Sequence, residues 1–470
     1  MPTLKQLSGL DSLFLYAENS RTPLEVGSLH IYDPSTSPRR GLRFKEVIAT
    51  IDQRLEQAGV FHRKILEVPL SIDHPYWVDD EHFDIEYHVR HIALPKPGDW
   101  RQLMIQVSRL RSRKLDKTRP LWVASVIEGL DNVEGLPPGC FALLFKMHHA
   151  TAAGAGGAAL QAAVHDLEPL EPASPDSQAA VRDLPTAPPN VVELLARGAL
   201  NNIVKSTRLV VGLGQAIPRL IRAKLATPGQ GEEEVPSTLF NRDRVTANRV
   251  IDGCQFDLAD LTAMAKSCDD AKINDVALAI VSGALRSYLD GRDDLPDQTL
   301  IAACPLNVRS DDAADADNMV SMMTTPLYTD IEDPLERLSA IVAGTRRAKA
   351  FTDIVGADTL TAIPMNVPAF VARGLTQPLI SLAMHLDTLS FNTIVSNVAG
   401  IQQPMYFCGA KMVAVFGTGP VIDRAGLFHT VFSYNGKVTF TFTACREMMP
   451  DPATYTECLR TSFAELRDSA

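Results

Sequence analysis

The sequence lacks several features that would narrow the role of the protein at once. Its seven cysteines are scattered and include no C-x-x-C pair, which argues against a disulfide framework or a cysteine-based zinc site and favours free thiols in a reducing compartment. No stretch of about 18 uncharged apolar residues occurs, so we predict no membrane span. The first residues show no basic segment followed by an apolar one, so we predict no secretory signal and expect a cytoplasmic protein.

The sequence also lacks an excess of positive charge. Its 45 Lys and Arg residues are outnumbered by 56 Asp and Glu residues, which gives a formal net charge of -11. We therefore expect no general nucleic-acid binding, because phosphate contacts require a basic surface. Hydrophobic residues make up 46% of the chain and charged residues 21%, a composition typical of folded globular proteins. The length of 470 residues suggests two or three domains.

Strand-like and helix-like segments alternate along the chain, which predicts an α/β fold. The predicted strands include 24–32, 121–129, 140–145, 300–308 and 391–397. The predicted helices include 43–57, 100–115, 275–289, 334–351 and 452–466. The pair Asn435-Gly436 between two alternating runs predicts a hairpin, because both residues tolerate positive φ.

A proline-rich stretch divides the chain. Six prolines between residues 168 and 190 predict an extended linker. It leads into 191–225, an amphipathic segment with six cations and one acid, in which Pro218 predicts a kink. Such a helix either lies on a membrane surface or packs on one domain as a crossover. We therefore predict three parts: an N-terminal subdomain at 1–167, the linker and basic helix at 168–238, and a C-terminal subdomain at 239–470.

Two adjacent histidines, His148 and His149, follow the apolar run 140–145. Successive side chains of an extended strand point in opposite directions, so one histidine can act while the other supports the turn. A free imidazole titrates near ~6.5 and can therefore accept a proton from a hydroxyl at neutral pH. The sequence has neither a metal-ligand spacing around this pair nor a Gly-x-Ser-x-Gly elbow, so we predict no metal and no serine nucleophile. Two histidines satisfied within a loop, without a chemical role, are the alternative.

The residues around the histidines are similar to the His-His-x-x-x-Asp-Gly motif of chloramphenicol acetyltransferase and the nonribosomal peptide condensation domains. The motif stands here as His148-His149-Ala150-Thr151-Ala152-Ala153-Gly154, with Ala153 in place of the aspartate. With five further segments, the sequence resembles the bacterial wax ester synthase/acyl-CoA:diacylglycerol acyltransferase (WS/DGAT) family along nearly its whole length. These segments are Leu10 to Phe14, Pro120-Leu121-Trp122, Asn274-Asp275, Pro305 to Arg309, and Ser396-Asn397-Val398-Ala399-Gly400, in which Ala399 replaces a proline.

The resemblance implies two chloramphenicol-acetyltransferase-like subdomains with an active-site tunnel at their interface. It implies direct transfer of a long-chain acyl group from acyl-CoA to a fatty alcohol or to diacylglycerol, without a cofactor, since acyl-CoA is a substrate. His149 would be the general base, and His148 and Gly154 would shape the turn. The oxyanion donor would be Asn274, Ser396 or a main-chain N–H near Gly154. The cations Arg111, Arg113 and Lys114 would meet the CoA phosphates or form a solvated helix face.

Three of the family segments also have an interpretation in packing alone. Pro120-Leu121-Trp122 would stiffen and bury the start of a strand rather than contact substrate. Asn274 or Asp275 would cap the helix that follows. Ser396 and Asn397 would satisfy turn carbonyls rather than bind substrate. The sequence leaves both interpretations open for each segment.

The alanine at position 153 is the main departure from the family. The superfamily aspartate is thought to pair with an arginine that holds the histidine loop, and Arg309 is our candidate for the arginine left unpaired. A lost partner of this kind costs roughly several kcal/mol of local order, so we expect reduced activity. The chain is then a natural relative that holds the loop otherwise, a weakened variant, or a degenerate paralogue that binds acyl ligands or a lipid surface. Peripheral contact with the inner membrane or lipid inclusions fits each account.

Overall fold

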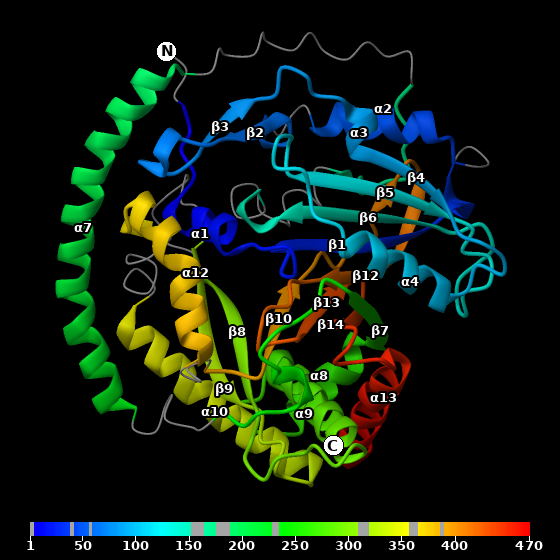
Figure 1. Cartoon of the computed structure of the whole chain (residues 1–470). Coiled ribbons are helices and arrows are strands. Elements are labelled where there is room, and N and C mark those ends of the chain that lie inside the picture. Colours follow the sequence, from blue (N-terminus) through cyan, green and yellow to red (C-terminus); the bar gives the residue numbers. More distant parts are fainter. Residues whose placement is uncertain are drawn as a thin grey trace.

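The computed structural model describes residues 4–37, 42–55, 59–151, 164–174, 189–227, 235–308, 319–356, 365–385 and 390–470. Within them, two six-stranded sheets lie one above the other with helices packed around them (Figure 1). The predicted α/β fold is confirmed. The seven cysteines, Cys140, Cys254, Cys268, Cys304, Cys408, Cys445 and Cys458, are free thiols.

The first sheet carries the two histidines. Its order is β11 (Tyr406–Phe407), β12 (Ala410–Thr418), β1 (Glu25–Asp33), β6 (Phe141–His148), β5 (Trp122–Glu128) and β4 (Val89–Ala93). Every residue of β6 is buried, because α4 (Trp100–Arg111) covers one face of the sheet and α2 (Phe44–Leu55) lies over the other. A strand that is covered on both faces reads in sequence as a continuous apolar run, as 140–145 does.

The second sheet has the order β7 (Arg249–Asp257), β14 (Lys437–Cys445), β13 (Leu427–Tyr434), β10 (Thr393–Ala399), β8 (Ile301–Val308) and β9 (Met319–Pro326). It packs against α8 (Leu258–Lys266), α9 (Ile273–Asp290), α10 (Pro334–Val355) and α13 (Pro452–Ser469). The predicted hairpin is confirmed, since Asn435 and Gly436 join β13 to β14 with φ of 45° and 79°. The predicted helices at 275–289, 334–351 and 452–466 are confirmed as α9, α10 and α13.

The remaining elements are short or lie at the edges. They are α1 (Gly9–Ala17), η1 (Pro34–Thr36), η2 (Gly59–His62), β2 (Arg63–Leu66), η3 (Pro69–Ser71), β3 (Tyr76–Asp79), α3 (Ile85–His88), α7 (Val191–Ala226), η4 (Leu239–Asn241) and α12 (Ala369–His385). The segment 83–94 contains α3 and continues as β4. Within the described ranges, no helix has the length and apolar character needed to span a membrane.

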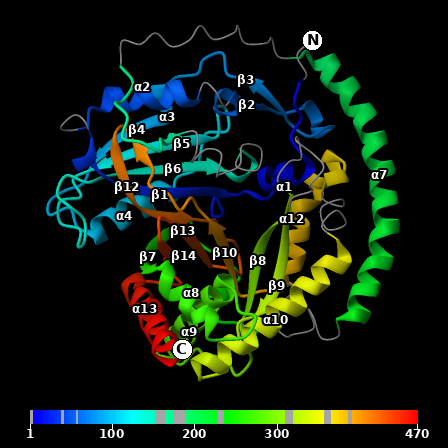
Figure 2. The ribbon, with the colours of Figure 1, turned by 180° about the vertical axis from the view of Figure 1, so that it is seen from behind.

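The two halves of the chain interlock. Strand β12, from the second half, pairs antiparallel with β1, with Thr418 opposite Gly27, and so completes the first sheet. In return, α4 of the first half packs on β7 of the second sheet, where Trp100 Nε1 donates to Asp252 Oδ1 at 2.7 Å. Figure 2 shows β12 lying with the first sheet from behind. A boundary at residue 239 therefore separates the chain but does not separate the two sheets.

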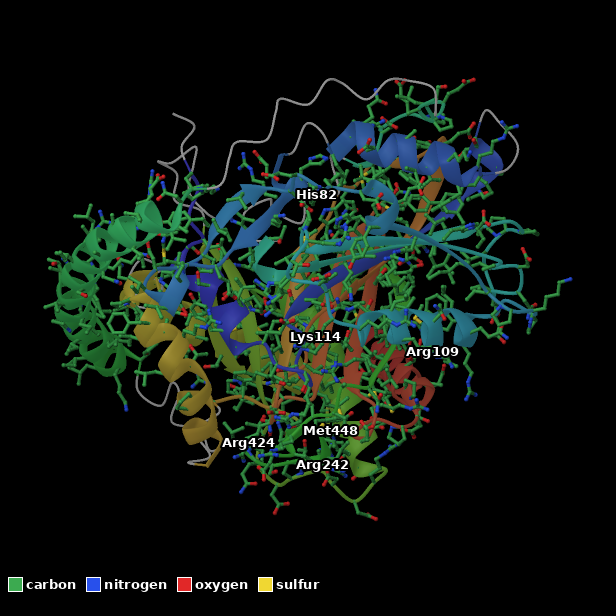
Figure 3. All side chains as sticks on the ribbon, turned by 45° about the horizontal axis from the view of Figure 1, so that its top comes forward. His82, Arg109, Lys114, Arg242, Arg424 and Met448 are labelled. Atoms are coloured by element: carbon green, nitrogen blue, oxygen red, sulfur yellow. The ribbon has the colours of Figure 1, made fainter. Side chains whose placement is uncertain are left out.

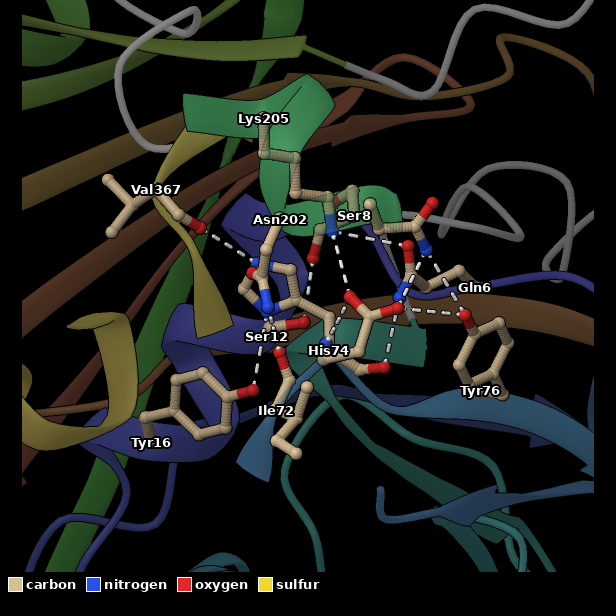
Figure 4. A network of polar contacts seen from close by, with 12 residues as sticks. Gln6, Ser8, Ser12, Tyr16, Ile72, His74, Tyr76, Asn202, Lys205 and Val367 are labelled. Atoms are coloured by element: carbon tan, nitrogen blue, oxygen red, sulfur yellow. Dashed lines mark hydrogen bonds and ion pairs between the residues drawn. The ribbon is translucent and has the colours of Figure 1, made fainter. Parts of the chain in front are cut away.

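Helix α7 runs along one side of the molecule (Figure 1). Its inner face packs against η3 and α10 and buries the small or apolar residues Leu194, Gly198, Ala216 and Ala223. Polar contacts fix it to the segment after η3, where Asn201 Nδ2 donates to Asp73 Oδ2 at 2.7 Å and Lys205 Nζ lies 3.4 Å from Asp73 Oδ1. Figure 4 shows Lys205 and Asn202 in this network.

The outer face of α7 is apolar and exposed. Its exposed large apolar side chains include Val192, Leu200, Ile203, Val204, Val210, Val211, Leu213, Ile217, Leu220, Ile221 and Leu225. We call these residues the α7 outer face. The helix thus packs on the body along one stripe, as a crossover helix would, and still presents an apolar surface to its surroundings. The helix therefore packs against the body, although it contacts both halves of the chain rather than one domain. Contact with a membrane surface stays a prediction.

Candidate active site

The histidine pair lies where β6 ends, and main-chain hydrogen bonds hold it on both sides. The His148 N–H donates to the Leu121 carbonyl at 3.0 Å, and the His149 N–H donates to the Leu24 carbonyl at 2.9 Å. These bonds tie the end of β6 to the segments that lead into β5 and β1. The two imidazoles therefore project from a backbone with little freedom to move.

His148 is almost completely buried, with 1% of its surface exposed. Its Nδ1 accepts a hydrogen bond from the Ala150 N–H at 3.1 Å, so its Nε2 carries the proton in the neutral ring. Burial, together with the nearby charge of Lys117, lowers the pKa of His148 to about 3. This ring is neutral at pH 7 and is hydrogen-bonded to the turn, while its buried Nε2 has no hydrogen-bond partner among the described residues. Its supporting role stays a prediction.

His149 stacks on Phe14 of α1, with ring centroids 3.8 Å apart and planes 21° from parallel. Burial lowers the pKa of His149 to about 4, opposed in part by its own main-chain carbonyl. Its Nδ1 is buried and has no hydrogen-bond partner among the described residues. Buried polar atoms are nearly always paired, so this unpaired nitrogen is unusual. At pH 7 the imidazole is neutral and able to accept a proton.

Phe14 is a residue whose role the sequence did not reveal. It lies in the segment Leu10 to Phe14, which the family resemblance includes, but nothing in the sequence indicates a contact with residue 149. The separation along the chain is too long for any helical or strand spacing to report it. Only the packing of α1 against the end of β6 places the two rings together.

Several sequence-predicted residues lie outside the described ranges. These are Ala153 and Gly154 of the motif, and Arg309, our candidate for the unpaired arginine. The loop that the motif aspartate would hold is therefore described only at its start, from His148 to Thr151, and again from Val164 onward.

The cations predicted for CoA phosphates divide into buried and exposed groups. Arg111 is only 4% exposed and lies against Glu25, so the prediction that it meets a phosphate is wrong. Lys114, labelled in Figure 3, is exposed and lies 3.9 Å from the Glu18 carboxylate. Arg113 is also exposed, as is Arg109 on α4. One face of α4 is buried and the opposite face is exposed, so arginines that are two residues apart differ strongly in exposure.

Two of the family segments meet at one place. The Asn397 Nδ2 at the end of β10 donates to the Asn274 Oδ1 at the start of α9, at 3.1 Å. Ser396 precedes Asn397 on the same strand and is half-buried. Because Asn274 uses its carbonyl oxygen here, its amide N–H groups point elsewhere and can donate to another acceptor.

The Asp275 carboxylate is held by hydrogen bonds within the protein. One carboxylate oxygen accepts from the Lys272 N–H at 2.8 Å, and the other accepts from the Thr345 hydroxyl at 2.7 Å. The side chain is buried at the first turn of α9, where a negative charge interacts favourably with the helix dipole. These contacts are those of a helix cap, the packing alternative for this residue.

The Pro120-Leu121-Trp122 segment is packed in the core. Trp122 is fully buried, donates from Nε1 to the Phe61 carbonyl at 2.8 Å and stacks on His88 and Phe145. Leu121 is also buried and supplies the carbonyl that accepts from His148. These contacts favour the packing interpretation, in which the segment fixes the strand beside the histidines.

No group of three or more His, Cys, Asp or Glu side chains that could hold a metal ion occurs in the described ranges.

Two family models match the chain. The wax ester synthase/diacylglycerol acyltransferase catalytic domain matches residues 7–277, and the WS/DGAT C-terminal domain matches residues 316–467. The chain belongs to the WS/DGAT family. The resemblance seen in the motifs is thus confirmed, and the protein is an acyl-CoA-dependent O-acyltransferase of this family.

Relatives and solved structures agree with this assignment. The O-acyltransferase WSD of Acinetobacter baylyi is 30% identical over 459 residues, which cover 95% of this chain and 93% of the relative. The wax ester synthase/diacylglycerol acyltransferase of Marinobacter aquaeolei VT8 superposes with a TM-score of 0.68 at 26% identity, over 99% of each chain. A trichothecene 15-O-acetyltransferase of Fusarium sporotrichioides has a TM-score of 0.60 at 10% identity, which shows a shared fold alone.

Proposed function

We propose that this WS/DGAT member transfers a long-chain acyl group from acyl-CoA to the hydroxyl of a fatty alcohol or a diacylglycerol, with His149 as the general base. The observation that carries the proposal is the fixed, neutral imidazole of His149 with an unpaired ring nitrogen at the end of β6. A neutral, half-buried imidazole on a fixed backbone is able to take a proton from a hydroxyl.

The reaction needs two proton transfers, one from the acceptor hydroxyl to His149 and one from His149 to the leaving thiolate. The imidazole of His149 takes the hydroxyl proton, and the acceptor oxygen forms a bond to the thioester carbonyl carbon. The tetrahedral intermediate then collapses, its C–S bond breaks, and the leaving CoA thiolate takes the proton back from the imidazolium. No acyl group is attached to the protein, and the imidazole ends neutral, ready for the next cycle.

Asn274 is our proposed donor to the oxyanion. Its side-chain amide is oriented by Asn397, which occupies its carbonyl oxygen and leaves its N–H groups to donate. A preoriented amide donor of this kind stabilises the negative oxygen of a tetrahedral intermediate. Ser396, beside it on β10, is the second candidate. The active-site tunnel would then run between the His149 end of the first sheet and the start of α9.

The function is tested by measuring CoA release from palmitoyl-CoA with hexadecanol and, separately, with dioleoylglycerol as acceptor. We expect release above the background of His149→Ala with at least one acceptor, at a rate limited by the missing carboxylate at position 153. Absence of His149-dependent release with both acceptors would contradict the proposal.

Restoring the carboxylate measures how far Ala153 limits the enzyme. We expect Ala153→Asp to raise kcat about 10- to 100-fold, because a charge-assisted bond contributes about 1.5–3 kcal/mol to the order of the loop. Ala153→Asn is the matched control, since it adds the same volume without the charge and should give a much smaller gain. No gain from the aspartate would favour a degenerate paralogue that binds acyl ligands without transferring them.

The α7 outer face favours a second property, peripheral contact with a lipid surface. An exposed apolar face on a helix with six cations and one acid is typical of interfacial helices, which lie in the headgroup region. It would bring the enzyme to the phase that holds its water-insoluble acceptors.

Flotation with vesicles that contain phosphatidylglycerol tests this contact. We expect the protein to float, and the triple variant Ile203→Gln, Val210→Gln, Ile217→Gln to remain in the bottom fraction. Ser206→Ala with Gln215→Ala, which changes exposed polar residues of the same helix, should float as the wild type does. Equal flotation of all three proteins would remove α7 from this role.

A further inference from the structure

Three charged side chains lie buried together beside the histidine turn. Glu25, Arg111 and Lys146 have exposed fractions of 0%, 4% and 6%. The pairing of β1 with β6 places Glu25 directly opposite His148, and Lys146 lies two residues earlier on the same strand and so on the same face. Arg111 belongs to the last turn of α4, which covers that face. We call these three residues the charge cluster.

The contacts of the charge cluster tie three segments together. The Glu25 carboxylate lies 3.1 Å from Lys146 Nζ and 3.8 Å from Arg111 Nη1, and it accepts from the Leu115 N–H at 2.8 Å. The Glu25 main-chain carbonyl accepts from Arg111 Nη2 at 2.7 Å. Lys146 also donates to the main-chain carbonyls of Leu110 and Arg113. One carboxylate thus fixes the turn after α4 against β1 and β6.

The same turn leads to the main-chain bonds of the histidines. The chain continues from Leu115 to Leu121, whose carbonyl accepts from the His148 N–H, while Leu24, next to Glu25, accepts from the His149 N–H. The charge cluster therefore holds the two segments that carry the acceptors of the histidine backbone. This connection does not pass through residue 153.

Burial of these charges is expensive. Removing two cations and one carboxylate from water is repaid only with good pairing, and apolar residues of similar size often stabilise a core equally well. Here one carboxylate serves two cations, and the Arg111 Nε has no hydrogen-bond partner in the described ranges. A buried ion pair selected for stability alone would match each cation with one carboxylate. This cost in free energy arises beside the histidines, where the charge cluster holds the geometry of the histidine turn.

We propose that Glu25, with Lys146 and Arg111, positions the His148-His149 turn for catalysis, so that these are positioning residues of an enzyme whose motif lacks its carboxylate. This inference rests on the proposed function. Its variants are Lys146→Met and Arg111→Met, each of which leaves one carboxylate facing one cation and so keeps the buried charge balanced. Glu25→Gln is less suitable, because it would leave two buried cations without a counter-charge.

Arg337 offers a matched control. It is 2% exposed, lies on α10, which packs against the second sheet, and likewise donates to main-chain carbonyls, those of Ile331 and Glu332. Its Nε also lacks a hydrogen-bond partner in the part of the chain that the structure describes. Arg337→Met therefore removes a buried arginine of the same kind without touching the charge cluster.

The experiment measures kcat, KM for palmitoyl-CoA and the melting temperature of the full chain, with His149→Ala as background. We expect Lys146→Met and Arg111→Met to lower kcat at least tenfold with KM changed less than twofold. Arg337→Met should lower the melting temperature as Arg111→Met does but leave kcat within twofold. Wild-type kcat in both cluster variants, or an equal fall in Arg337→Met, would overturn the positioning role. Absence of His149-dependent release in the wild type would instead contradict the proposed function itself, and with it this role.

Discussion

His429 on β13 is a buried imidazole, whereas His149, which directly follows β6, is half-buried, and the two differ in what their nitrogens contact. In the second sheet, His429 lies 2.7 Å from the Tyr455 hydroxyl through Nε2 and 3.1 Å from the Thr393 hydroxyl through Nδ1. Burial lowers its pKa to about 3. His149 has a similarly lowered pKa of about 4, but its Nδ1 has no hydrogen-bond partner among the residues that the structure describes. A lowered pKa therefore reports burial. An unpaired ring nitrogen does not by itself mark the base either, since the buried Nε2 atoms of His88 and His148 also lack hydrogen-bond partners among the described residues. His149 is our candidate because it is the half-buried member of the motif pair.

The largest expected effect separates these two histidines. His149→Ala should lower kcat by about 10³-fold, within the range for loss of a general base. His429→Ala should leave kcat per folded molecule nearly unchanged and lower the melting temperature, because the Tyr455 and Thr393 hydroxyls lose a buried partner. Steady-state kinetics and thermal unfolding of both variants measure this difference.

His148→Ala is the informative third variant of the same series. Since its Nδ1 accepts from the Ala150 N–H, we expect it to harm the turn and reduce stability while some transfer remains. Equal residual rates in His148→Ala and His149→Ala would contradict the division of roles between the two rings.

The next largest effect concerns the asparagine pair. Asn274→Ala should lower kcat about 10²-fold, as the loss of one oxyanion donor does elsewhere, with little change in the KM for acyl-CoA. Asn397→Ala should cost about tenfold, because it only orients Asn274. If Asn397→Ala proved the more damaging of the two, Asn397 itself or Ser396 would be the donor.

The pH dependence of kcat/KM gives a smaller but diagnostic difference. Because the pKa of His149 is lowered to about 4, the base stays neutral as the pH falls and is lost only near pH 4. At pH 5.5 the enzyme should keep nearly its full rate, whereas a histidine with an ordinary pKa of ~6.5 would keep about a tenth. A pH-rate profile with an acid limb near 6.5 would show that solvent reaches the ring.

The sign for stability follows from the same shift. The unfolded chain binds a proton to this histidine below ~6.5, while the folded chain does so only near pH 4. Stability should therefore decline as the pH falls below ~6.5, and the contribution of His149 should level off near pH 4. Urea unfolding of wild type and His149→Ala at several pH values isolates this contribution.

The smallest expected effect concerns Phe14. Its stacking on His149 should contribute about 0.5–1.5 kcal/mol to the orientation of the ring, which corresponds to about a 2- to 10-fold change in rate. Phe14→Leu should lower kcat by that factor, while Phe14→Tyr, which keeps the ring, should cost less. A full rate in Phe14→Leu would mean that the main-chain bonds alone position the imidazole.

Local patterns predicted much of the fold. The hairpin at Asn435-Gly436, the buried strand β6 and the helices α9 and α13 depend on turn chemistry and periodicity within one segment, which the sequence displays directly. The site was predictable where a motif names residues in order, as for His148 and His149. Contacts between distant segments were not, because nothing in the local pattern of Phe14 or Asn397 identifies a partner more than 100 residues away.

The error over Arg111 has the same origin. Its neighbours Arg109 and Arg113 are exposed, and the sequence shows three similar arginines in one basic run. Only the crossing of α4 over β1 and β6 decides that Arg111 faces Glu25 while the others face solvent. Burial of a charge depends on tertiary packing, which helical spacing alone does not specify.

The exchange of β12 between the halves has a consequence for how the chain is made. Because β12 ends at Thr418, the ribosome has synthesised most of the protein before β1 acquires its neighbour on that side. Until then β1 is an open apolar edge, the kind of surface that invites pairing between chains. The histidine-bearing sheet is therefore encoded early and completed late, and residues 1–238 expressed alone would lack the strand that closes it.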